Sequence, residues 1–397
     1  MSPEGSGEPQ RAEPVRAVCL AVEGFYPMGG TERQVVEIAV ELHRRAIPVT
    51  VLCRWPVPVD NRYAEELRQA GVRVIASGWT DAPGGRLRRL PYLWARLRGG
   101  WRDPHQTERQ LWRWQAAKVR RLRRAGLVLH EVPYGGLLSR PGRQTLTAID
   151  IPLVVTVFGG LHAPTLDLPG AVITADGAPT INPPGTNYTW VPSIGHRALA
   201  TLQPDHRRPS SGMVVYGGRL VPEKDVDSLL RAMTLLPEGL ELVIAGDGVE
   251  RPRLERLAGA LRIRARFLGA IEPTELFELL RRCDVAAFPG LQDGLPSFIV
   301  EALGAGLPVV GTDVGGIPRA LEGSGGLVVP PGSPGAMADG IGRLIGGDLP
   351  RHRRLARRAY EERFTPARVV DRYLECYAEA FDRSRDRARD CGEPARA

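Results

Sequence analysis

Short, continuous apolar runs alternate with amphipathic segments along the first half of the chain. Runs of strand length cover residues 15–22, 49–53, 72–76, 127–130 and 153–157. Between the first two runs, Val35, Ile38 and Leu42 recur at the spacing of one helix face. A second helical pattern covers 63–70, whereas the turn-rich stretch 163–192 shows no clear period. This alternation predicts buried parallel strands that are joined by helices.

The second half repeats the alternation more regularly. Its predicted strands are 213–216, 240–245, 265–268, 285–288 and 308–311. Its predicted helices lie near 225–236, 249–260, 273–283 and 297–304, and the chain from 333 onward is also helical in pattern. The fold class that follows is α/β, with two Rossmann-like, doubly wound parallel-sheet domains and a cleft between them.

The length of 397 residues also favours two domains over one core. We expect a disordered leader (1–14), a first domain (15–200) with an insert (82–125), and a linker (201–211). The second domain (212–365), a terminal helix that crosses back over the first (366–382), and a disordered tail (383–397) complete the division.

The composition is that of a soluble protein, with 43% hydrophobic and 25% charged residues. No apolar run approaches the roughly 20 residues that span a bilayer. The leader lacks the apolar centre of a signal peptide, so we expect a cytoplasmic protein. The five cysteines are scattered without metal-ligand spacing, which argues against a disulfide framework: Cys19, Cys53, Cys283, Cys376 and Cys391.

The net charge of +8 is concentrated in the insert. Residues 86–124 hold thirteen basic and two acidic residues, a net +11, so the remainder is about −3. A uniformly basic nucleic-acid binder is therefore excluded. Two interpretations of the insert stay open: it lies on an anionic membrane surface, peripheral on the inner face, or it is a solvated helical hairpin whose tryptophans pack on the core. Those tryptophans are Trp94, Trp101, Trp112 and Trp114.

Two segments of the second half carry candidate chemistry. The chain has only two lysines among 53 basic residues, and one of them, Lys224, follows Arg219 just after a predicted strand. A compact ammonium suits a phosphate oxygen, and a guanidinium can bind two oxygens at once. The second segment places Asp293 before a glycine turn and Glu301 about one turn into a helix. Together these groups could hold a diphosphate and a ribose without a metal.

These segments resemble the retaining glycosyltransferases of family 4, which have the GT-B fold. The resemblance is nearly continuous over 213–381, and in the first half it is carried only by the glycine loop. The matching segments are Met28-Gly29-Gly30-Thr31-Glu32, 218–224, Gly246-Asp247-Gly248, 293–301, 312–318 and the terminal helix. The resemblance implies a metal-independent transfer, with retention of configuration, of a sugar from a nucleotide diphosphate donor to a hydroxyl acceptor.

The resemblance also implies residue roles. Arg219, Lys224 and Asp293 would be catalytic, the two cations stabilising charge on the departing diphosphate. This chain has Asp293 where the family usually has glutamate, which keeps the charge with a shorter reach. Gly246 and Gly248 flank Asp247 in a loop that is either a base contact or a plain turn. The expected donor-binding residues are Gly29, Gly30, Gly218, Gly246, Gly248, Gly294, Leu295, Pro296, Ser297 and Glu301.

The acceptor-side candidates are His130, Phe158 and His162. Phe158 stands where related enzymes tend to carry a histidine that touches the 6-hydroxyl of the donor. Either its ring faces a 6-deoxy sugar or pentose, or it is a core residue and His162 substitutes for the histidine. His130 either lines the acceptor cleft or is an ordinary histidine with satisfied hydrogen bonds.

No metal or further cofactor is expected. Asp225-Val226-Asp227 imitates a metal-binding motif, but it directly follows Lys224 and starts a helix, where capping accounts for it. Two alternatives to transfer remain: a sugar-nucleotide epimerase of the same fold, and a catalytically silent relative that acts as a partner protein. The acceptor class is open among glycolipids, cell-surface polysaccharides and natural products.

Overall fold

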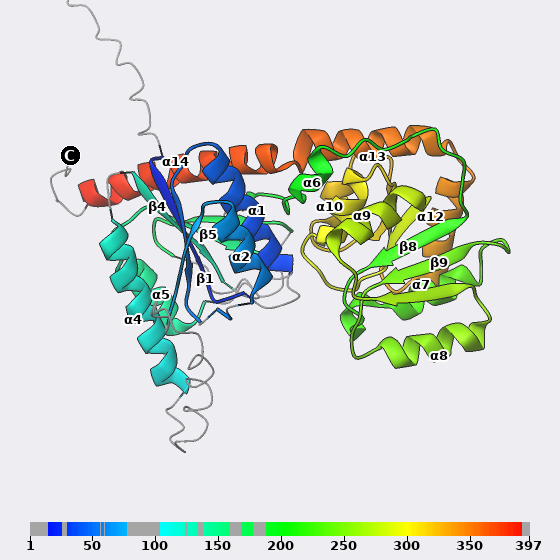
Figure 1. Cartoon of the computed structure of the whole chain (residues 1–397), viewed down its shortest axis with the longest axis horizontal. Coiled ribbons are helices and arrows are strands. Elements are labelled where there is room, and N and C mark those ends of the chain that lie inside the picture. The colour runs from blue at the N-terminus through cyan, green and yellow to red at the C-terminus, as the bar shows by residue number, and fades with distance from the viewer. Residues whose placement is uncertain are drawn as a thin grey trace, which may run out of the picture.

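The computed structural model describes residues 15–25, 30–55, 57–58, 60–77, 104–123, 126–133, 138–158, 168–177 and 188–390. Two α/β domains lie side by side, and one helix extends from the second back across the first (Figure 1). Several expectations fall outside the described residues: the leader 1–14, Gly29, His162, and most of the insert, with Trp94 and Trp101.

The first domain is built on a seven-stranded sheet of order β3-β2-β1-β4-β5-β6-β7, in which every pairing is parallel. The strand order reverses between β1 and β4, so a crevice forms beyond the carboxyl ends of these two strands. The strands are β1 (Ala17–Val22), β2 (Val49–Cys53), β3 (Arg73–Ala76), β4 (Leu127–Val132), β5 (Leu153–Val157), β6 (Val172–Ala175) and β7 (Thr189–Trp190).

Helices cover both faces of this sheet. On one face, α1 (Gly30–Arg44) packs against α2 (Arg62–Gln69) and against the last helix, α14 (Pro366–Asp390). On the other face, α4 (Pro104–Leu122) packs against α5 (Arg140–Thr147). Two separate apolar clusters result, one below α1 and α14 and the other below α4 and α5. Trp112 belongs to the second cluster and is buried.

The second domain repeats the design with a six-stranded parallel sheet of order β10-β9-β8-β11-β12-β13. Here the strand order reverses between β8 and β11, which places a second crevice beyond their carboxyl ends. The strands are β8 (Met213–Gly217), β9 (Glu241–Ala245), β10 (Ala265–Gly269), β11 (Val285–Phe288), β12 (Val309–Thr312) and β13 (Leu327–Val329).

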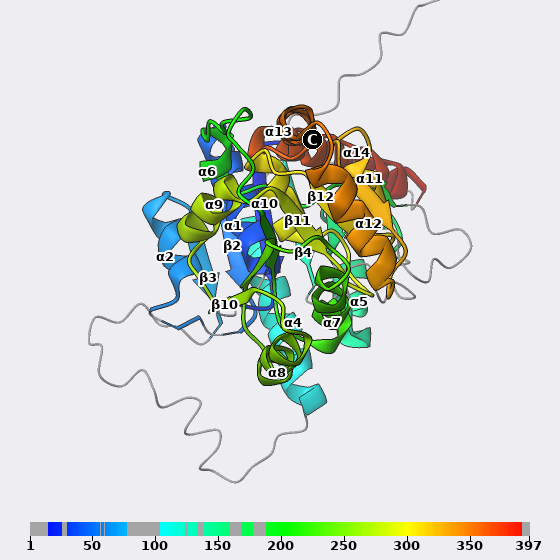
Figure 2. The ribbon, with the colours of Figure 1, turned by 90° about the vertical axis from the view of Figure 1, so that its right-hand side faces the viewer.

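Figure 2 shows helices α9 and α10 on one side of this second sheet and α7, α8 and α12 on the other. One large apolar cluster joins both faces of the sheet to the helices. The helices are α7 (Val226–Met233), α8 (Arg251–Leu261), α9 (Pro273–Arg282), α10 (Ser297–Gly304), α11 (Ile317–Leu321), α12 (Pro334–Ile345) and α13 (Leu349–Arg363).

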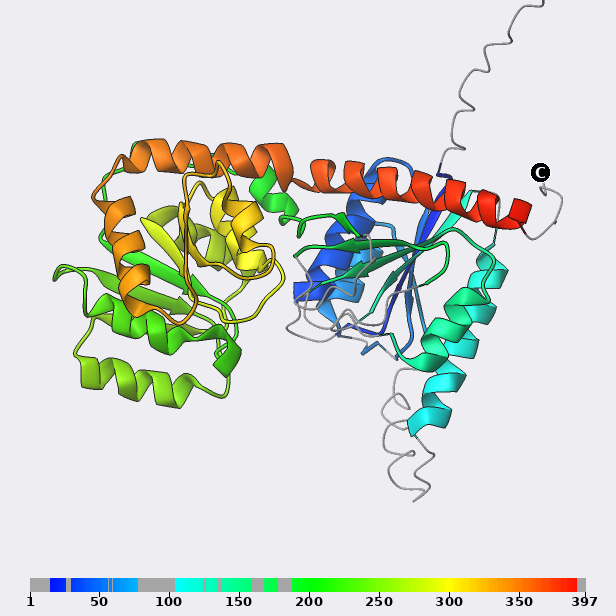
Figure 3. The same cartoon turned by 180° about the vertical axis from the view of Figure 1, so that it is seen from behind.

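Two chain crossings connect the domains. Helix α13 packs on α10 of the second domain, and α14 continues from it along the first (Figure 3). The second crossing follows β7 and includes the short helix α6 (Arg197–Ala200). The crossings are bonded to each other, because the amide of Gly195 donates to the carbonyl of Phe364 at 2.8 Å.

The structure departs from the sequence expectations mainly in short elements. Strands β6, β7 and β13 and helix α5 were not predicted, and β6 and β7 lie in the turn-rich stretch. Helix α14 continues to Asp390, so the tail expected from 383 is helical at its start. No helix within the described ranges combines the length and apolar character that crossing a membrane requires.

Candidate functional site

Lys224 and Asp293 meet where the strand order of the second sheet reverses. Lys224 ends a 3-10 turn (Pro222–Lys224) that follows β8, and Asp293 follows β11. The amide of Leu291 donates to the carbonyl of Glu223 at 2.9 Å, which ties the two loops together. The Lys224 ammonium then donates to Oδ2 of Asp293, and both side chains are largely withdrawn from solvent, with 12% and 17% exposed.

Arg219 lies in the same loop as Lys224 but is exposed. Its side chain is 61% accessible, and Nη2 lies 3.8 Å from Oε1 of Glu223. An exposed pair at this distance restrains the guanidinium weakly. The carbonyl of Arg219 accepts a hydrogen bond of 3.0 Å from the buried Tyr216 hydroxyl, which fixes the backbone below the side chain. The structure thus anchors the position of Arg219 and leaves its guanidinium able to turn toward a ligand.

The glycine loops after β8 and β9 are packed directly against each other. The amide of Gly218 donates to Ala245 O, and the amide of Leu220 donates to Asp247 O, both at 2.9 Å. A Cβ atom added to Gly246, whose φ is 150°, would lie 1.8 Å from the Gly218 carbonyl oxygen. Glycine at 246 is therefore required by this close approach. Oδ1 of Asp247 accepts from the Gly248 amide at 2.7 Å, and Oδ2 lies 3.3 Å from Arg251 Nη1.

Glu301 lies inside α10, which Ser297 begins after Pro296 at the cap position. Burial raises the pKa of the Glu301 carboxyl to about 7, although the charge of Arg33 in the first domain lowers it and that of Glu37 raises it further. A carboxyl with this pKa changes charge near neutral pH. The carboxyl that we expect to accept ribose hydroxyls is therefore sensitive to the first domain.

Asp176 and Ser193 of the first domain reach the loop between Asp293 and α10. Oδ2 of Asp176 accepts from the Leu295 amide at 3.1 Å, and the Ser193 hydroxyl donates to the Leu295 carbonyl at 2.9 Å. The Gly294 amide donates to Oδ1 of Asp293 at 3.0 Å. The amides of Gly294 and Leu295, two of the expected donor-binding residues, thus have protein acceptors in this structure. Sequence reasoning missed Asp176 and Ser193, because they lie in or beside the stretch without a clear period.

The first-domain candidates that the structure describes, Gly30, His130 and Phe158, lie in different surroundings. Gly30 opens α1 and is exposed, with open space where a Cβ would stand. Phe158 is 9% exposed and packs in the cluster below α1 and α14, which favours the core interpretation.

Of the two interpretations of His130, the structure supports the histidine with satisfied hydrogen bonds rather than a cleft residue. It is fully buried on β4, where its ring nitrogens bond to the Tyr377 hydroxyl at 2.8 Å and to Thr156 Oγ1 at 2.6 Å. Burial lowers its pKa to about 3, so the ring is neutral. His130 therefore belongs to a buried hydrogen-bond network between the first sheet and α14.

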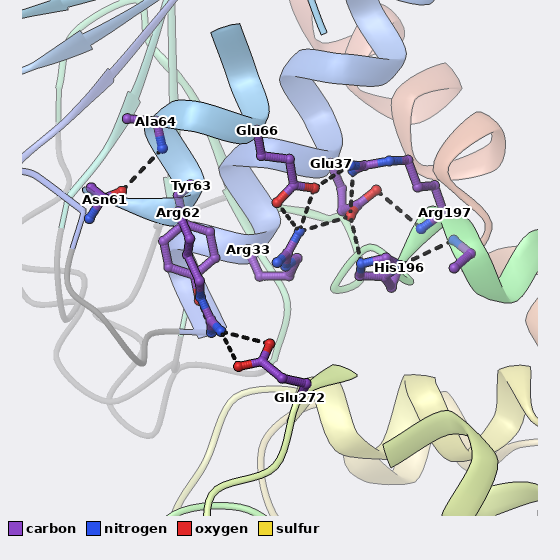
Figure 4. A network of polar contacts seen from close by, with 11 residues as sticks. Arg33, Glu37, Asn61, Arg62, Tyr63, Ala64, Glu66, His196, Arg197 and Glu272 are labelled. Carbon is purple, nitrogen blue, oxygen red and sulfur yellow. Dashed lines mark hydrogen bonds and ion pairs between the residues drawn. The ribbon is translucent and has the colours of Figure 1, made fainter. Parts of the chain in front are cut away.

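A charged network lies between the domains in Figure 4. Arg33 Nη1 binds Glu66 at 2.8 Å, and Arg197 Nη1 binds Glu37 at 2.9 Å. Burial, with the charges of Arg33 and Arg197, lowers the pKa of the neighbouring His196 to about 4. Arg62 reaches Glu272 of the second domain at 3.2 Å.

Glu37, Glu66 and His196 form the one cluster with metal-ligand spacing in the part of the chain that the structure describes. Both carboxylates are already paired with guanidinium groups, so a cation would have to displace them.

The Asp225-Val226-Asp227 motif does not form a second cluster of this kind. Asp227 pairs with Arg231 and Arg253, and Asp225, at a φ of 45°, makes no side-chain capping bond, so its expected capping role is wrong.

Comparison with known sequences finds relatives of the second domain. Residues 211–346 match the model described as Glycosyl transferases group 1. An uncharacterized glycosyltransferase of Methanocaldococcus jannaschii is 32% identical over 164 residues, 40% of this chain and 41% of that protein. A D-inositol 3-phosphate glycosyltransferase of Mycolicibacterium gilvum is 36% identical over 174 residues, 42% and 38% of the two chains. An alpha-D-kanosaminyltransferase of Streptomyces kanamyceticus is 34% identical over 139 residues, 34% and 36% of the chains. These matches span about two fifths of the relatives.

Solved structures share the fold over nearly the whole chain. A glycosyltransferase from Rickettsia africae has a TM-score of 0.69 at 15% identity and covers 92% of this chain and 98% of its own. Anabaena HepE, in complex with UDP, has a TM-score of 0.64 at 17% identity and covers 90% and 98%. Together with the two parallel sheets, these neighbours establish the GT-B fold. Residues 211–346 therefore match the group 1 glycosyl transferase model, within a chain that has the GT-B fold.

Proposed function

We propose that this protein transfers a sugar from a nucleotide diphosphate donor to a hydroxyl acceptor, with retention of configuration and without a metal. The observation that carries the proposal is the contact between Lys224 and Asp293 beyond β8 and β11. Ligands of open α/β sheets bind where the strand order reverses, and this pair lies there in the second sheet.

The charge of each site residue indicates its proposed role in the reaction. Lys224 stabilises negative charge as the diphosphate leaves, because a fixed cation acts strongly where charge develops. The exposed Arg219 guanidinium turns toward the same diphosphate and adds a second positive charge. Asp293 holds the Lys224 ammonium and, in the proposed complex, accepts from donor-sugar hydroxyls. Glu301, when ionised, accepts from the ribose. Two cations supply the charge that a metal would otherwise supply, which supports metal independence.

The structural neighbour from Anabaena holds UDP, so UDP-sugars are the first donors to test. A thermal-shift screen with UDP-, GDP-, ADP- and dTDP-sugars identifies the donor, because a ligand that binds only the native state raises the melting temperature. Nucleotide release is then measured with and without EDTA, and the anomeric configuration of the product is read by NMR.

The alternatives give different outcomes. An epimerase converts the bound donor to an epimeric nucleotide sugar when no acceptor is present. A silent partner protein shows the melting shift without turnover in any acceptor mixture. Transfer that requires an acceptor, survives EDTA and retains the anomeric configuration supports the proposal, and inversion or loss of activity in EDTA contradicts it.

The described part of the insert presents a basic surface that bears on membrane contact. Helix α4 buries Trp112, and exposed arginines lie along it and just after its end: Arg109, Arg113, Arg120, Arg121 and Arg123. We propose that any contact of this helix with an anionic membrane is electrostatic rather than an insertion of Trp112.

A further inference from the structure

The two domains touch directly at the loop that carries Asp293. Asp176 follows β6 of the first domain, and its Oδ2 accepts from the Leu295 amide of the second domain at 3.1 Å. The Ser193 hydroxyl donates to the Leu295 carbonyl at 2.9 Å, and its oxygen lies 3.2 Å from Asp176 Oδ2. Asp176, Ser193 and Leu295 are each at most 3% exposed. The first domain therefore holds both backbone polar groups of one residue in the candidate donor site.

Glycines allow the two backbones to approach each other at this contact. A Cβ atom added to Gly177 would lie 2.7 Å from the Gly316 nitrogen, and one added to Gly316 would lie 2.1 Å from the Asp176 carbonyl oxygen. The Gly316 amide in turn donates to the Gly294 carbonyl at 2.8 Å, which joins the contact to the loop with Asp293. The contact depends on glycine at both positions, so a methyl group at 177 would push the domains apart.

An aromatic side chain extends the contact beside Asp176. Trp190 on β7 donates from Nε1 to the Asp176 carbonyl at 3.1 Å. The guanidinium of Arg319, on α11 of the second domain, lies over the indole with Cζ 4.2 Å from the ring centroid. A cation over an aromatic ring is attracted to it, so this pair adds to the hydrogen bonds. A carboxylate, a hydroxyl and an indole of the first domain thus all meet the second domain here.

The Leu295 amide cannot bind Asp176 and a donor at the same time. The amide carries one proton, and in this structure the Asp176 carboxylate accepts it. In the proposed donor complex Leu295 is a donor-binding residue, so the sugar diphosphate requires the same amide. The charge of Asp176 would also lie beside the negative diphosphate, and like charges that are brought together are costly. Donor binding and the bond between Asp176 and Leu295 therefore exclude each other.

We propose that Asp176 is autoinhibitory: its carboxylate takes the place of a donor oxygen on the Leu295 amide, and the donor binds only after the domains separate at this contact. The inference rests on the proposed function and adds a regulatory step to it. The apparent affinity for a donor is then the intrinsic affinity reduced by the fraction of molecules in which the contact is open. A weaker contact should raise that fraction and tighten donor binding.

Two variants weaken the contact by different means, and both leave the second domain unaltered. Asp176→Asn removes the charge at nearly the same size, and a hydrogen bond to a charged acceptor is roughly twice as strong as a neutral one. Gly177→Ala places a methyl group against Gly316. The matched controls are Asp150→Asn, at an exposed carboxylate of the first domain, and Gly259→Ala on α8, where an added Cβ meets open space.

Isothermal titration calorimetry on the full chain measures the Kd, with UDP-, GDP-, ADP- and dTDP-glucose as the probes. For the probe that binds most tightly, Asp176→Asn and Gly177→Ala should each lower the Kd at least about fivefold, and both controls should leave it unchanged. A purely structural role of Asp176 gives the opposite result, an unchanged or higher Kd with a lower melting temperature. That result from a folded Asp176→Asn protein overturns the inference, and Gly177→Ala decides the question if Asp176→Asn does not fold.

Hydrogen exchange followed by mass spectrometry gives a second readout. A bound ligand ordinarily slows the exchange of amides that it covers. In the wild type, the peptide that contains Asp176 and Gly177 should instead exchange faster when the probe is bound, because the contact opens. Slower or unchanged exchange of this peptide contradicts the separation of the domains.

Failure of the inference and failure of the proposed function give different results. If no probe binds to the wild type or to either variant, the proposed function fails, and the inference fails with it. If a probe binds with the same Kd to the wild type and to both variants, only the autoinhibition is wrong.

Discussion

The Lys224 ammonium is bonded to the Asp293 carboxylate across 69 residues of sequence, and both side chains are largely buried. Each group fixes the rotamer of the other at the carboxyl edge of the second sheet. In the proposed reaction, the ammonium stabilises charge on a departing diphosphate with little reorganisation, because it is already oriented and partly desolvated.

Replacement of Lys224 tests this arrangement. Lys224→Ala should reduce kcat by about a hundred- to a thousandfold, the usual effect of removing one fixed donor to developing charge. The matched control is Lys118→Ala on α4, which removes the only other lysine of the chain. Steady-state kinetics and nucleotide binding separate the two effects. A Lys224→Ala enzyme with wild-type kcat contradicts the assigned role.

Glu301 predicts a pH dependence. Its pKa is raised to about 7 from an ordinary value of 4.5. Folding therefore favours the protonated carboxyl, and the stability that this contributes is complete below the ordinary value and is lost as the pH rises through 7. Glu301→Gln should accordingly gain in melting temperature over the wild type between about pH 5 and about pH 8.

Nucleotide binding should show the opposite trend with pH. In the proposed complex the ionised Glu301 accepts ribose hydroxyls, so wild-type affinity should rise through neutral pH, whereas Glu301→Gln should show a flat profile. Isothermal titration calorimetry at several pH values measures both. A wild-type profile that is flat through pH 7 contradicts the assignment of Glu301 to the ribose.

His130 predicts a structural effect. His130→Ala removes the partner of Tyr377 and Thr156 and leaves a cavity below α14, so we expect a loss of about 3 kcal/mol in the free energy of unfolding. Urea denaturation measures this loss, with the exposed His43→Ala as the control.

The effect of His130 on stability should also depend on pH. Because its pKa is lowered to about 3, the contribution of His130 to the free energy of unfolding should shrink as the pH falls below the ordinary pKa of 6.5. A cost that is constant down to acid pH contradicts this account.

The exposed arginines of α4 predict salt-sensitive membrane contact. Co-sedimentation with anionic vesicles should occur at low salt and disappear by about 0.5 M salt, because the Debye length then falls to a few ångström. Arg113→Glu with Arg120→Glu should abolish it, and Arg68→Glu on α2, also exposed, should not. Binding that persists at high salt indicates insertion, and no binding at low salt rejects the membrane contact.

Much of the fold could be predicted because buried parallel strands occur in the sequence as continuous apolar runs. The apolar runs before Arg219, Gly246 and Asp293 are strands β8, β9 and β11, so the apolar pattern predicted correctly where the carboxyl-end loops of the second domain lie. The helix that begins at Ser297 also followed from local chemistry, whereas the need for glycine at 246 comes from the close approach of Gly218. Strands β6 and β7, with four and two residues, were too short for a periodic signal.

The sequence by itself determined the two-domain α/β fold and the local chemistry of the loops, since apolar periodicity and turn residues act over a few neighbouring positions. Only the tertiary structure decided that His130 is buried and that Asp176 bonds to Leu295 across the domains. These relationships join residues far apart in the chain. Their burial and pairing depend on how sheets and helices pack, and the local pattern of apolar and polar residues does not specify that packing.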